Sequence, residues 1–398
     1  MSKIDDLIKE LCPDGVEFKR LGAVCNKIKT GGQRNKSTLS KTRSSENQYP
    51  VINGGISESG FTNEFNTPSN TITVSQGGAS SGFVNYMTEN FWAGAHCYVV
   101  SPSDESYLNN RYLYFILKNS QNLLMDKAVG AGIPGLNSRV LNEYKIPIPP
   151  LEVQKEIVRV LDSFTELEAE LEAELEARKK QYVYYRNTLL TFNDDVMWKP
   201  MGEVGELIRG SGLQKKDFTE EGFPCIHYGQ LYTYYDSEAT DTKSFTSEEV
   251  FQKLKKALRG DVLIAGTSEN INDVCKPCYW NGHETIGVSG DMFIFRPNKD
   301  ISGKYLTYVL QSDSFMTYKR RYVTGTKVIR LSADSLKRFK ISIPPLEKQK
   351  QIVSILDKFE KLTNDISVGL PAEIEARRKQ YEYYRNKLLT FKELECSR

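Results

Sequence analysis

The side chains best suited to chemistry are two clusters of cations. Between Phe18 and Ser45 there are eight basic residues and no acidic one. Amide and hydroxyl side chains lie among them, and this mixture on a loop suits contact with DNA phosphates and base edges. An ordinary solvated basic loop is the alternative. The residues of this cluster predicted to contact DNA are Lys27, Lys29, Arg34, Asn35, Lys36, Lys41 and Arg43.

A comparable cluster lies in the other half of the chain, again without an acidic residue and flanked by Tyr318 and Tyr322. Two basic surfaces in two halves of one chain favour DNA as the ligand. The predicted DNA-binding residues of this half are Lys319, Arg320, Arg321, Lys327 and Arg330, together with the pair Lys215 and Lys216. The tyrosine-rich run from Leu231 to Tyr235 alternates and predicts a strand.

Catalytic signatures are missing from the sequence. There is no G-x-x-x-x-G-K-[ST] loop, no H-E-x-x-H pair, no G-x-S-x-G elbow and no N-P-P-aromatic or D-P-P-aromatic tetrapeptide. Cys275 and Cys278 form a C-x-x-C near His283, but no second pair stands at zinc-site spacing, so no metal site is predicted. We therefore predict no catalytic residue, and recognition without chemistry.

A third group of residues is suited to protein interfaces, because tyrosine and arginine are the types that anchor them. Packing of one helix on another is the alternative, although tyrosines at i, i+2 and i+3 cannot all face one helix. The predicted subunit-docking residues are Tyr182, Tyr184, Tyr185 and Arg186, repeated as Tyr381, Tyr383, Tyr384 and Arg385.

The elements that carry these tyrosines are duplicated. Residues 146–164, IPIPPLEVQKEIVRVLDSF, return as residues 341–359, ISIPPLEKQKQIVSILDKF, with 13 of 19 positions identical. ARKKQYVYYRNTLLTF, residues 177–192, returns as ARRKQYEYYRNKLLTF, residues 376–391, with 13 of 16 identical. We call the two helical regions the first rod and the second rod. A pseudo-twofold relation between the halves would run them antiparallel.

Helix periodicity and a Pro-Pro start predict one continuous helix from Leu151 to Leu190, about 60 Å long at 1.5 Å per residue. Its LEAELEAELEA repeat predicts a spacer, in which adding four residues shifts the flanking parts by about 6 Å and rotates them by about 40°. The second rod contains Gly369-Leu370-Pro371, which predicts a break near Gly369 and a restart with Pro371 at the first helical position.

The blocks between the rods are basic, with 13 basic against 9 acidic side chains in residues 16–145 and 21 against 18 in residues 196–340. Short apolar runs at residues 71–74, 97–100, 262–264 and 292–295 predict strands among glycine-rich turns. We predict mixed α+β blocks of one shared fold. Seven irregularly spaced cysteines, no signal peptide and no apolar membrane span favour a cytoplasmic protein.

With these motifs assembled, the chain resembles the specificity subunits of type I restriction-modification enzymes over nearly its whole length. The resemblance implies an α+β fold with a pseudo-twofold internal repeat. Its predicted parts are a first target-recognition domain (1–148), a central helical spacer (149–192), a second target-recognition domain (193–343) and a C-terminal helical region (344–398).

The resemblance further implies a non-catalytic reader of double-stranded DNA that binds a split target, one half-site per recognition domain. Its implied partners are two modification subunits, which use S-adenosylmethionine to methylate adenine, and restriction subunits that use ATP and Mg²⁺. No cofactor is expected in this chain. Two alternatives stay open: a self-contained DNA-modifying enzyme, and a coiled-coil scaffold that does not bind DNA.

Overall fold

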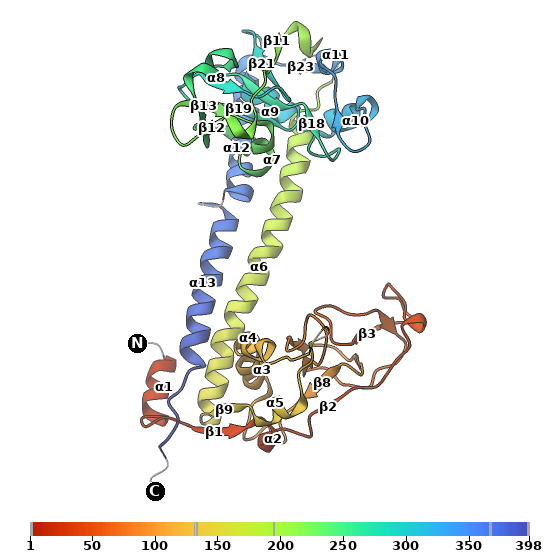
Figure 1. Cartoon of the computed structure of the whole chain (residues 1–398), viewed down its shortest axis with the longest axis vertical. Coiled ribbons are helices and arrows are strands. Elements are labelled where there is room, and N and C mark those ends of the chain that lie inside the picture. The colour runs from red at the N-terminus through yellow and green to blue at the C-terminus, as the bar shows by residue number, and fades with distance from the viewer. Residues whose placement is uncertain (1–2, 131, 133, 194–195, 366–367, 396–398) are drawn as a thin grey trace. The chain divides into compact units, whose positions relative to one another are not determined.

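The computed structural model describes residues 3–130, 132, 134–193, 196–365 and 368–395. Contacts divide the chain into two units, which are described separately below. The first unit comprises Met1–Leu171 and Ile374–Arg398, and the second comprises Glu172–Glu373. Two helices, α6 (Leu151–Leu189) and α13 (Leu370–Leu388), contribute to both units (Figure 1). The four-part division drawn from the sequence stays a prediction.

The first unit combines short helices with three small sheets, ordered β2-β8-β5-β6, β4-β3-β7 and β1-β9. Its helices are α1 (Lys3–Leu11), α2 (Leu21–Val24), the 3-10 turn η1 (Lys36–Thr38), α3 (Asn110–Asn119), α4 (Gln121–Asp126) and α5 (Ser138–Glu143). Its strands are β1 (Glu17–Arg20), β2 (Lys29–Thr30), β3 (Tyr49–Ile52), β4 (Phe61–Thr62), β5 (Thr71–Ser75), β6 (Val84–Met87), β7 (Trp92–Ala93), β8 (Cys97–Val100) and β9 (Lys145–Ile148).

The second unit has sheets ordered β11-β21-β17-β19-β14, β12-β15-β13-β20-β16, β10-β23 and β18-β22. Its helices are η2 (Met201–Glu203), η3 (Lys215–Asp217), α7 (Tyr228–Thr233), α8 (Glu248–Lys253), α9 (Gly303–Val309), α10 (Asp313–Tyr322), α11 (Ala333–Arg338) and α12 (Leu346–Asn364). Its strands are β10 (Met197–Pro200), β11 (Gly205–Arg209), β12 (Phe218–Thr219), β13 (Phe223–Ile226), β14 (Glu238–Ala239), β15 (Ser244–Thr246), β16 (Lys255–Ala257), β17 (Val262–Ala265), β18 (Thr267–Ser268), β19 (Pro277–Trp280), β20 (Ile286–Val288), β21 (Met292–Pro297), β22 (Ile329–Arg330) and β23 (Lys340–Ile343).

The two units repeat one strand plan, which confirms the predicted α+β class and internal duplication. The order β2-β8-β5 in the first unit corresponds to β11-β21-β17 in the second. The parallel pair β3 and β7 corresponds to β13 and β20, and the antiparallel pair β1 and β9 corresponds to β10 and β23. The central strands β5 and β17 are buried along their whole length, as the apolar runs in the sequence predict.

The glutamine of the repeated PPLExQ motif fixes each rod to its globular block. Gln154 is fully buried; its Oε1 accepts from the Asn109 amide at 2.8 Å, and its Nε2 donates to the carbonyls of Tyr107 (3.0 Å) and Pro149 (2.8 Å). Gln349 is equally buried and repeats this pattern, with the Ser302 amide at 2.8 Å and the carbonyls of Asp300 and Pro344 at 2.9 Å. One buried amide thus satisfies three backbone groups in each unit.

A cation of each block also pairs with its rod. In the first unit the Arg111 guanidinium lies 2.8 Å from Asp162 of α6. In the second, the largely buried ammonium of Lys304 lies 2.7 Å from Glu238 and 3.4 Å from Asp357 of α12. Burial opposes the charge of Lys304, but the hydrogen bond that its ammonium donates to Glu238 and the nearby carboxylates outweigh burial and raise the pKa of Lys304.

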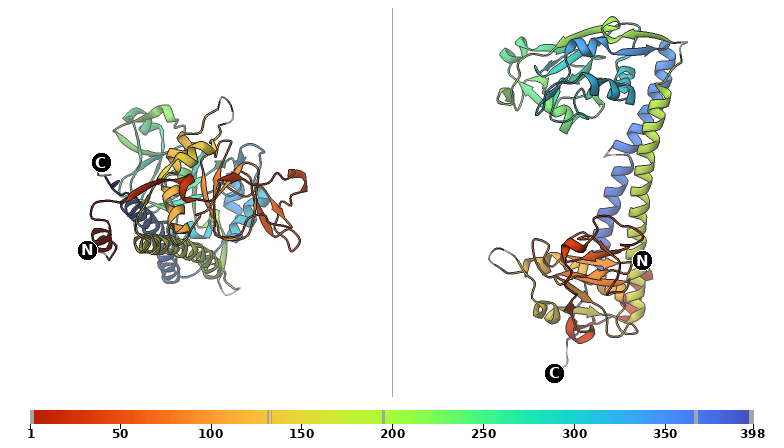
Figure 2. Two further views of the ribbon diagram at one scale, coloured as in Figure 1. Left: turned by 90° about the horizontal axis from the view of Figure 1, so that it is seen from below. Right: turned by 90° about the vertical axis from the view of Figure 1, so that its right-hand side faces the viewer.

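Helix pairing within each unit is antiparallel, as predicted. In the first unit, Phe164 of α6 stacks on Tyr384 of α13 at a ring-centroid distance of 5.5 Å, and Glu168 pairs with Arg378 at 2.5 Å. In the second unit, Phe359 of α12 stacks on Tyr185 of α6 at 5.4 Å. Figure 2 shows the helices from two further sides.

Two local predictions need correction. Pro371 is the second residue of α13, not the first, although the break itself lies where the sequence places it, between Asn364 and Leu370. The run from Leu231 to Tyr235 is not a strand, because it lies largely in helix α7. The His227 imidazole caps this helix by accepting from the Gly229 amide at 3.2 Å, a local signal that outweighs the alternating pattern.

No helix in the described part of the chain is long and apolar enough to span a membrane.

Candidate nucleic-acid interface

The basic loop of the first unit runs from α2 to β3 and is held at its glycine pair. The Gly31 amide donates to the carbonyls of Gly94 and Cys97, both at 3.1 Å, and the Gly32 amide to the Ala93 carbonyl at 2.9 Å. A Cβ on Gly31 would lie 1.9 Å from the Ala93 oxygen, so only glycine fits there. The loop is therefore anchored against the turn between β7 and β8.

Three of the predicted DNA-binding residues in this loop are engaged in internal contacts. The Arg34 guanidinium lies 3.0 Å from Glu64 and 4.3 Å from the centre of the Trp92 ring. Arg43 pairs with Glu89 at 2.6 Å. The Asn35 side chain accepts from the Ser37 amide at 3.1 Å and caps η1. These three side chains shape the loop.

The remaining four cations of this loop are the better candidates for phosphate contact. All four are exposed, and none forms an ion pair with a described residue. Their ammonium groups are thus available to a polyanion, which would gain by releasing its counterions. These residues are Lys27, Lys29, Lys36 and Lys41.

The structure removes Lys319 from the predicted cluster of the second unit. Its side chain is 4% exposed, and its Nζ donates to the carbonyls of Asn272 and Val274, both at 2.8 Å. Burial lowers the pKa of Lys319. Its periodic position on α10 turns it inward, whereas its neighbour Arg320 is exposed.

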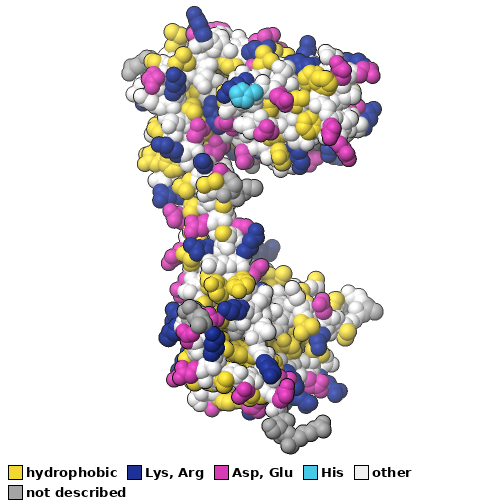
Figure 3. Space-filling view, turned by 90° about the vertical axis from the view of Figure 1, so that its left-hand side faces the viewer, with side chains coloured by type: hydrophobic (Ala, Val, Ile, Leu, Met, Phe, Trp, Pro, Cys, Tyr) yellow, Lys and Arg dark blue, Asp and Glu magenta, His cyan; other side chains and the backbone are white. Residues whose placement is uncertain are grey.

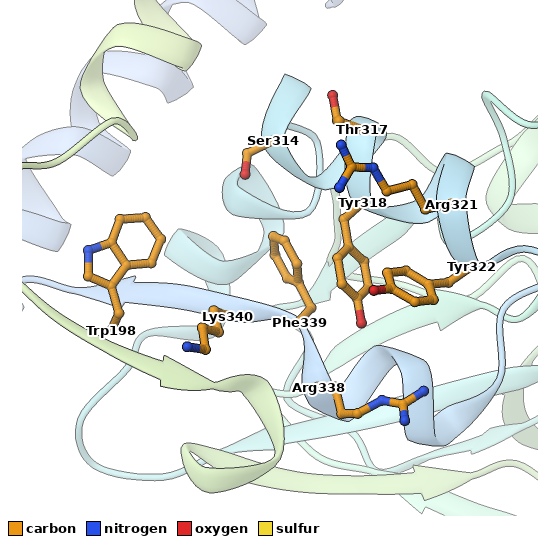
Figure 4. Close-up of a pocket in the computed structure, with 9 residues that line it drawn as sticks. All are labelled: Trp198, Ser314, Thr317, Tyr318, Arg321, Tyr322, Arg338, Phe339 and Lys340. Atoms are coloured by element: carbon orange, nitrogen blue, oxygen red, sulfur yellow. The ribbon is translucent and has the colours of Figure 1, made fainter.

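Arg321 lies in an aromatic cavity of about 550 Å³ that faces α10 and strands β10 and β23 (Figure 4). Rings of Trp198, Tyr318, Tyr322 and Phe339 form its walls, and Arg338 and Lys340 add two further cations. Tyr318 is fixed by donating to the Ser335 carbonyl at 2.7 Å. Among the residues that the structure describes, no acidic side chain lines this cavity, so it suits an apolar or planar group that carries a negative charge.

Lys327 and Arg330 lie elsewhere, on a hairpin closed by reciprocal 2.9 Å hydrogen bonds between the backbones of Thr324 and Arg330. Arg330 lines a separate cavity of about 310 Å³. Sequence reasoning missed two charged residues there, Arg209 and Asp291. They are isolated in the sequence: the pairing of β11 with β21 brings Arg209 near Asp291, and the pairing of β18 with β22 adds Arg330.

Exposed Lys215 and Lys216 lie on η3, whose start is fixed by the Gln214 amide donating to Asp217 at 2.8 Å. The predicted second cluster is therefore spread over the η3 turn, the exposed side of α10, an aromatic cavity and a hairpin. On the face drawn in Figure 3, Lys and Arg are likewise interspersed with Asp and Glu. DNA contact by this unit would thus be made at several points.

The tyrosines of the rods divide between packing and exposure. Tyr182 is 7% exposed and packs on Phe359, whereas Tyr184 is 65% exposed; Tyr383, at the matching place in the second rod, is 63% exposed. Tyr185 and Tyr384 stack on the phenylalanines as described above. Each rod therefore presents one largely exposed tyrosine beside two whose rings pack on another helix, although Tyr185 is still 38% exposed.

Two equivalent arginines, Arg186 and Arg385, lie beside these tyrosines. Each guanidinium is placed over a ring of its own helix, Arg186 at 5.4 Å from the Tyr182 centroid and Arg385 at 5.5 Å from that of Tyr381. The Nε of each is buried without a hydrogen-bond partner among the described residues.

The C-x-x-C pair does not form a shared site in this structure. Cys275 packs in the core beneath α9 and α10, whereas Cys278, on β19, packs in the core beneath α7. Burial raises the pKa of both thiols to about 12, which disfavours the thiolate that binds metals. His283 instead lies 3.4 Å from Arg259.

Comparison with known proteins agrees with this architecture. The family model for the type I restriction modification DNA specificity domain matches twice, at residues 13–177 and 193–376. A putative type I restriction enzyme specificity subunit of Haemophilus influenzae is 33% identical over 395 residues, covering 94% of this chain and 96% of the relative. The EcoR124I/EcoR124II specificity subunit of Escherichia coli is 35% identical over 261 residues, covering 63% and 64%.

Among solved structures, the S subunit of a type I restriction-modification system from M. genitalium aligns with a TM-score of 0.59 at 20% identity, covering 94% of this chain and 96% of that one. A chain from a study of complex assembly and conformational transition of the type I R-M system aligns with the same TM-score at 17% identity, covering 95% and 98%. These two likenesses concern the fold. With two matched domains and a full-length relative, the chain belongs to the type I restriction-modification DNA specificity family.

Proposed function

We propose that this chain is the DNA sequence-specificity subunit of a type I restriction-modification complex and reads a bipartite target, one half-site per recognition domain. The observation that carries the proposal is the double match to the DNA specificity domain, one copy for each globular block. The chain is a non-catalytic reader. The assembled complex carries the adenine-N6 methyltransferase and site-specific deoxyribonuclease activities.

The charge distribution supports DNA as the ligand. The exposed lysines of the first unit lie on a loop anchored by Gly31 and Gly32. In the second unit, exposed Arg320 and Lys327 add cations on a helix and a hairpin. Each unit thus offers cations for phosphate contact, together with polar side chains for base edges.

The repeated rod surface supports docking of two modification subunits. Tyr184 and Tyr383 occupy matching positions and are almost equally exposed, and each is followed two residues later by an arginine whose Nε–H has no partner among the described residues. Tyrosine and arginine are both residue types that typically anchor protein interfaces. Two equivalent surfaces suit two copies of one partner, and restriction subunits would join through the complex. S-adenosylmethionine, ATP and Mg²⁺ belong to those partners.

The proposal is tested with the chain assembled with the modification subunits of its own system. Sequencing of methylated adenines in DNA treated with this complex should give one split motif, and binding to a duplex with that motif should weaken steeply with salt. Replacing Lys36 and Lys41 by Gln should reduce the slope of log K against log salt by roughly 2, because each phosphate contact contributes about 0.9.

Lys180→Gln, on the exposed surface of α6, is the control for loss of positive charge and should leave that slope unchanged. A complex that binds every duplex equally would refute the proposal. Methyl transfer by the purified chain without partners would instead favour a self-contained enzyme.

A further inference from the structure

Each unit contains a cavity at the same place in its fold, of about 520 Å³ in the first unit and about 310 Å³ in the second. Of the described residues, ten line the first cavity, and nine of these have a counterpart lining the second. The matched positions are Gln76 and Gly266, Gly77 and Thr267, His96 and Asp291, Tyr98 and Phe293, Val129 and Thr324, Gly135 and Arg330, Leu136 and Leu331, Asn137 and Ser332, and Ser138 and Ala333.

Backbone hydrogen bonds at the floor of the two cavities show that their positions in the fold are equivalent. The Gln76 amide donates to the His96 carbonyl at 2.9 Å, and the Gly266 amide donates to the Asp291 carbonyl at 2.8 Å. Both bonds lie directly beyond the paired central strands, β5 with β8 and β17 with β21. The two cavities therefore begin at the same point of the same strand pair.

The rim matches as well. Val129 and Gly135 exchange backbone hydrogen bonds of 3.1 and 3.0 Å, and Thr324 and Arg330 exchange two of 2.9 Å. Gly135 then bridges to Gly77, as Arg330 does to Thr267. Floor and rim thus share one backbone frame in both units.

The matched side chains fall into two classes. Those that hold the frame keep their chemistry: Leu136 and Leu331 are buried, and Asn137 and Ser332 each accept from an amide at the start of the following helix. The polar side chains that face the cavity differ between the units, and they are Gln76, His96 and Ser138 in the first and Thr267, Asp291 and Arg330 in the second. A fixed frame with exchanged polar groups is what reading of two different sequences requires.

We propose that this repeated cavity is the base-reading site of each recognition domain, with Arg330 and Arg209 discriminating bases of one half-site and Gln76 and His96 those of the other. The inference rests on the proposed function and assigns it to specific residues. The ligand is the edge of a base pair in the major groove of double-stranded DNA, where each pair presents a distinct set of donors and acceptors.

The side chains define what each cavity reads. Arg330 is exposed, and within the described residues its guanidinium forms no ion pair; Arg209 is steadied by donating from Nε to the Gly290 carbonyl at 3.3 Å. Arginine donates two parallel hydrogen bonds to O6 and N7 of guanine, so the half-site of the second unit includes guanine. Gln76, which donates to the Tyr98 hydroxyl at 3.3 Å, suits N6 and N7 of adenine in the other.

Methylated-adenine sequencing with the assembled complex tests the assignment. Arg330→Gln should relax one base of one half-site, with discrimination against the wrong base falling by about tenfold to a hundredfold, and leave the other half-site unchanged. Gln76→Ala should relax one base of the half-site that the first unit reads and leave the half-site of the second unit unchanged. Arg330→Lys keeps the charge but lacks the two-pronged donor, so it should retain affinity and still lose discrimination.

Arg320→Gln is the matched control, because it removes the same charge from an exposed site outside the cavity and should weaken binding to all sequences alike. Because Arg330 joins its hairpin through backbone bonds, its substitution keeps the frame. If Arg330→Gln and Gln76→Ala both leave the methylated motif unchanged while wild type keeps its split motif, the base-reading assignment is wrong and the proposed function stands. A wild-type complex without any motif would overturn the proposed function instead.

Discussion

Replacing Gln349 by Leu removes the buried amide that joins the second rod to its block. The substitution keeps a side chain of similar volume but leaves the Ser302 amide and the carbonyls of Asp300 and Pro344 without their partner. We expect the free energy of unfolding of the second unit to fall. Gln351→Leu is the control, because Gln351 is exposed two residues further along the same helix.

The expected loss follows from three backbone groups in a site with no exposed surface. Each buried donor or acceptor that loses its partner costs about 1 to 3 kcal/mol, and the added apolar surface of leucine recovers about 1 to 2 kcal/mol. For three such groups the net loss is therefore roughly 1 to 8 kcal/mol. The control should change stability by less than about 0.5 kcal/mol.

Urea denaturation gives the free energies, and hydrogen exchange read by mass spectrometry gives the location. Gln349→Leu should shift the midpoint to lower urea and speed exchange at the start of α12 and in the loop before α9. Equal midpoints for Gln349→Leu and Gln351→Leu would show that these three hydrogen bonds do not hold the rod to the block. Gln154→Leu should repeat the effect in the first unit, because its three bonds are the same.

Three further predictions concern DNA spacing, a buried lysine and docking. Inserting one four-residue LEAE unit after Leu171 lengthens the helix by about 6 Å, and one base pair occupies about 3.4 Å, so the unread gap should lengthen by about two base pairs. An unchanged gap in sequenced methylated DNA would contradict the spacer hypothesis. Lys319→Met should lower the thermal unfolding temperature with little effect on the salt dependence of DNA binding. Arg320→Gln should reduce that salt dependence and leave the unfolding temperature unchanged. A reduced salt slope for Lys319→Met at wild-type stability would instead show that the Lys319 ammonium contacts DNA. In a titration with modification subunits, Tyr184→Ala should weaken the affinity by about tenfold without loss of stability, whereas Tyr182→Ala should destabilise the chain. An unchanged affinity for Tyr184→Ala would exclude that ring from the interface.

The rods could be predicted because their signals are local. Helix periodicity, the Pro-Pro starts and Pro371 together determine where α6 and α13 begin and where the second rod breaks. The alternation at Leu231–Tyr235 misled because the capping of α7 by His227 depends on one imidazole orientation, which a period count ignores. The role of the repeated glutamine was also invisible, because its partners in the globular blocks lie 45 to 49 positions away in sequence.

The candidate interface could be predicted in composition but not in detail. A run of cations indicates where positive charge gathers, but it does not show that Lys319 is buried while its neighbour Arg320 is exposed. Nor does it show that Arg34 pairs with Glu64, which lies 30 positions away. The repeated cavity is formed by short segments that lie far apart in the sequence, so only strand register reveals that Gln76 and Gly266 are equivalent. Long-range pairing of this kind leaves no periodic trace in a sequence.

The antiparallel pair of β1 with β9 has a consequence for how such a chain can diversify. Glu17 lies opposite Ile148, so the first block begins and ends on neighbouring strands about 5 Å apart, and Met197 opposite Ile343 repeats this in the second unit. A block whose first and last strands are paired can be exchanged without moving the helix to which it is attached. Recombination between related genes at these junctions can therefore replace a whole globular block in a single event and leave the rods intact.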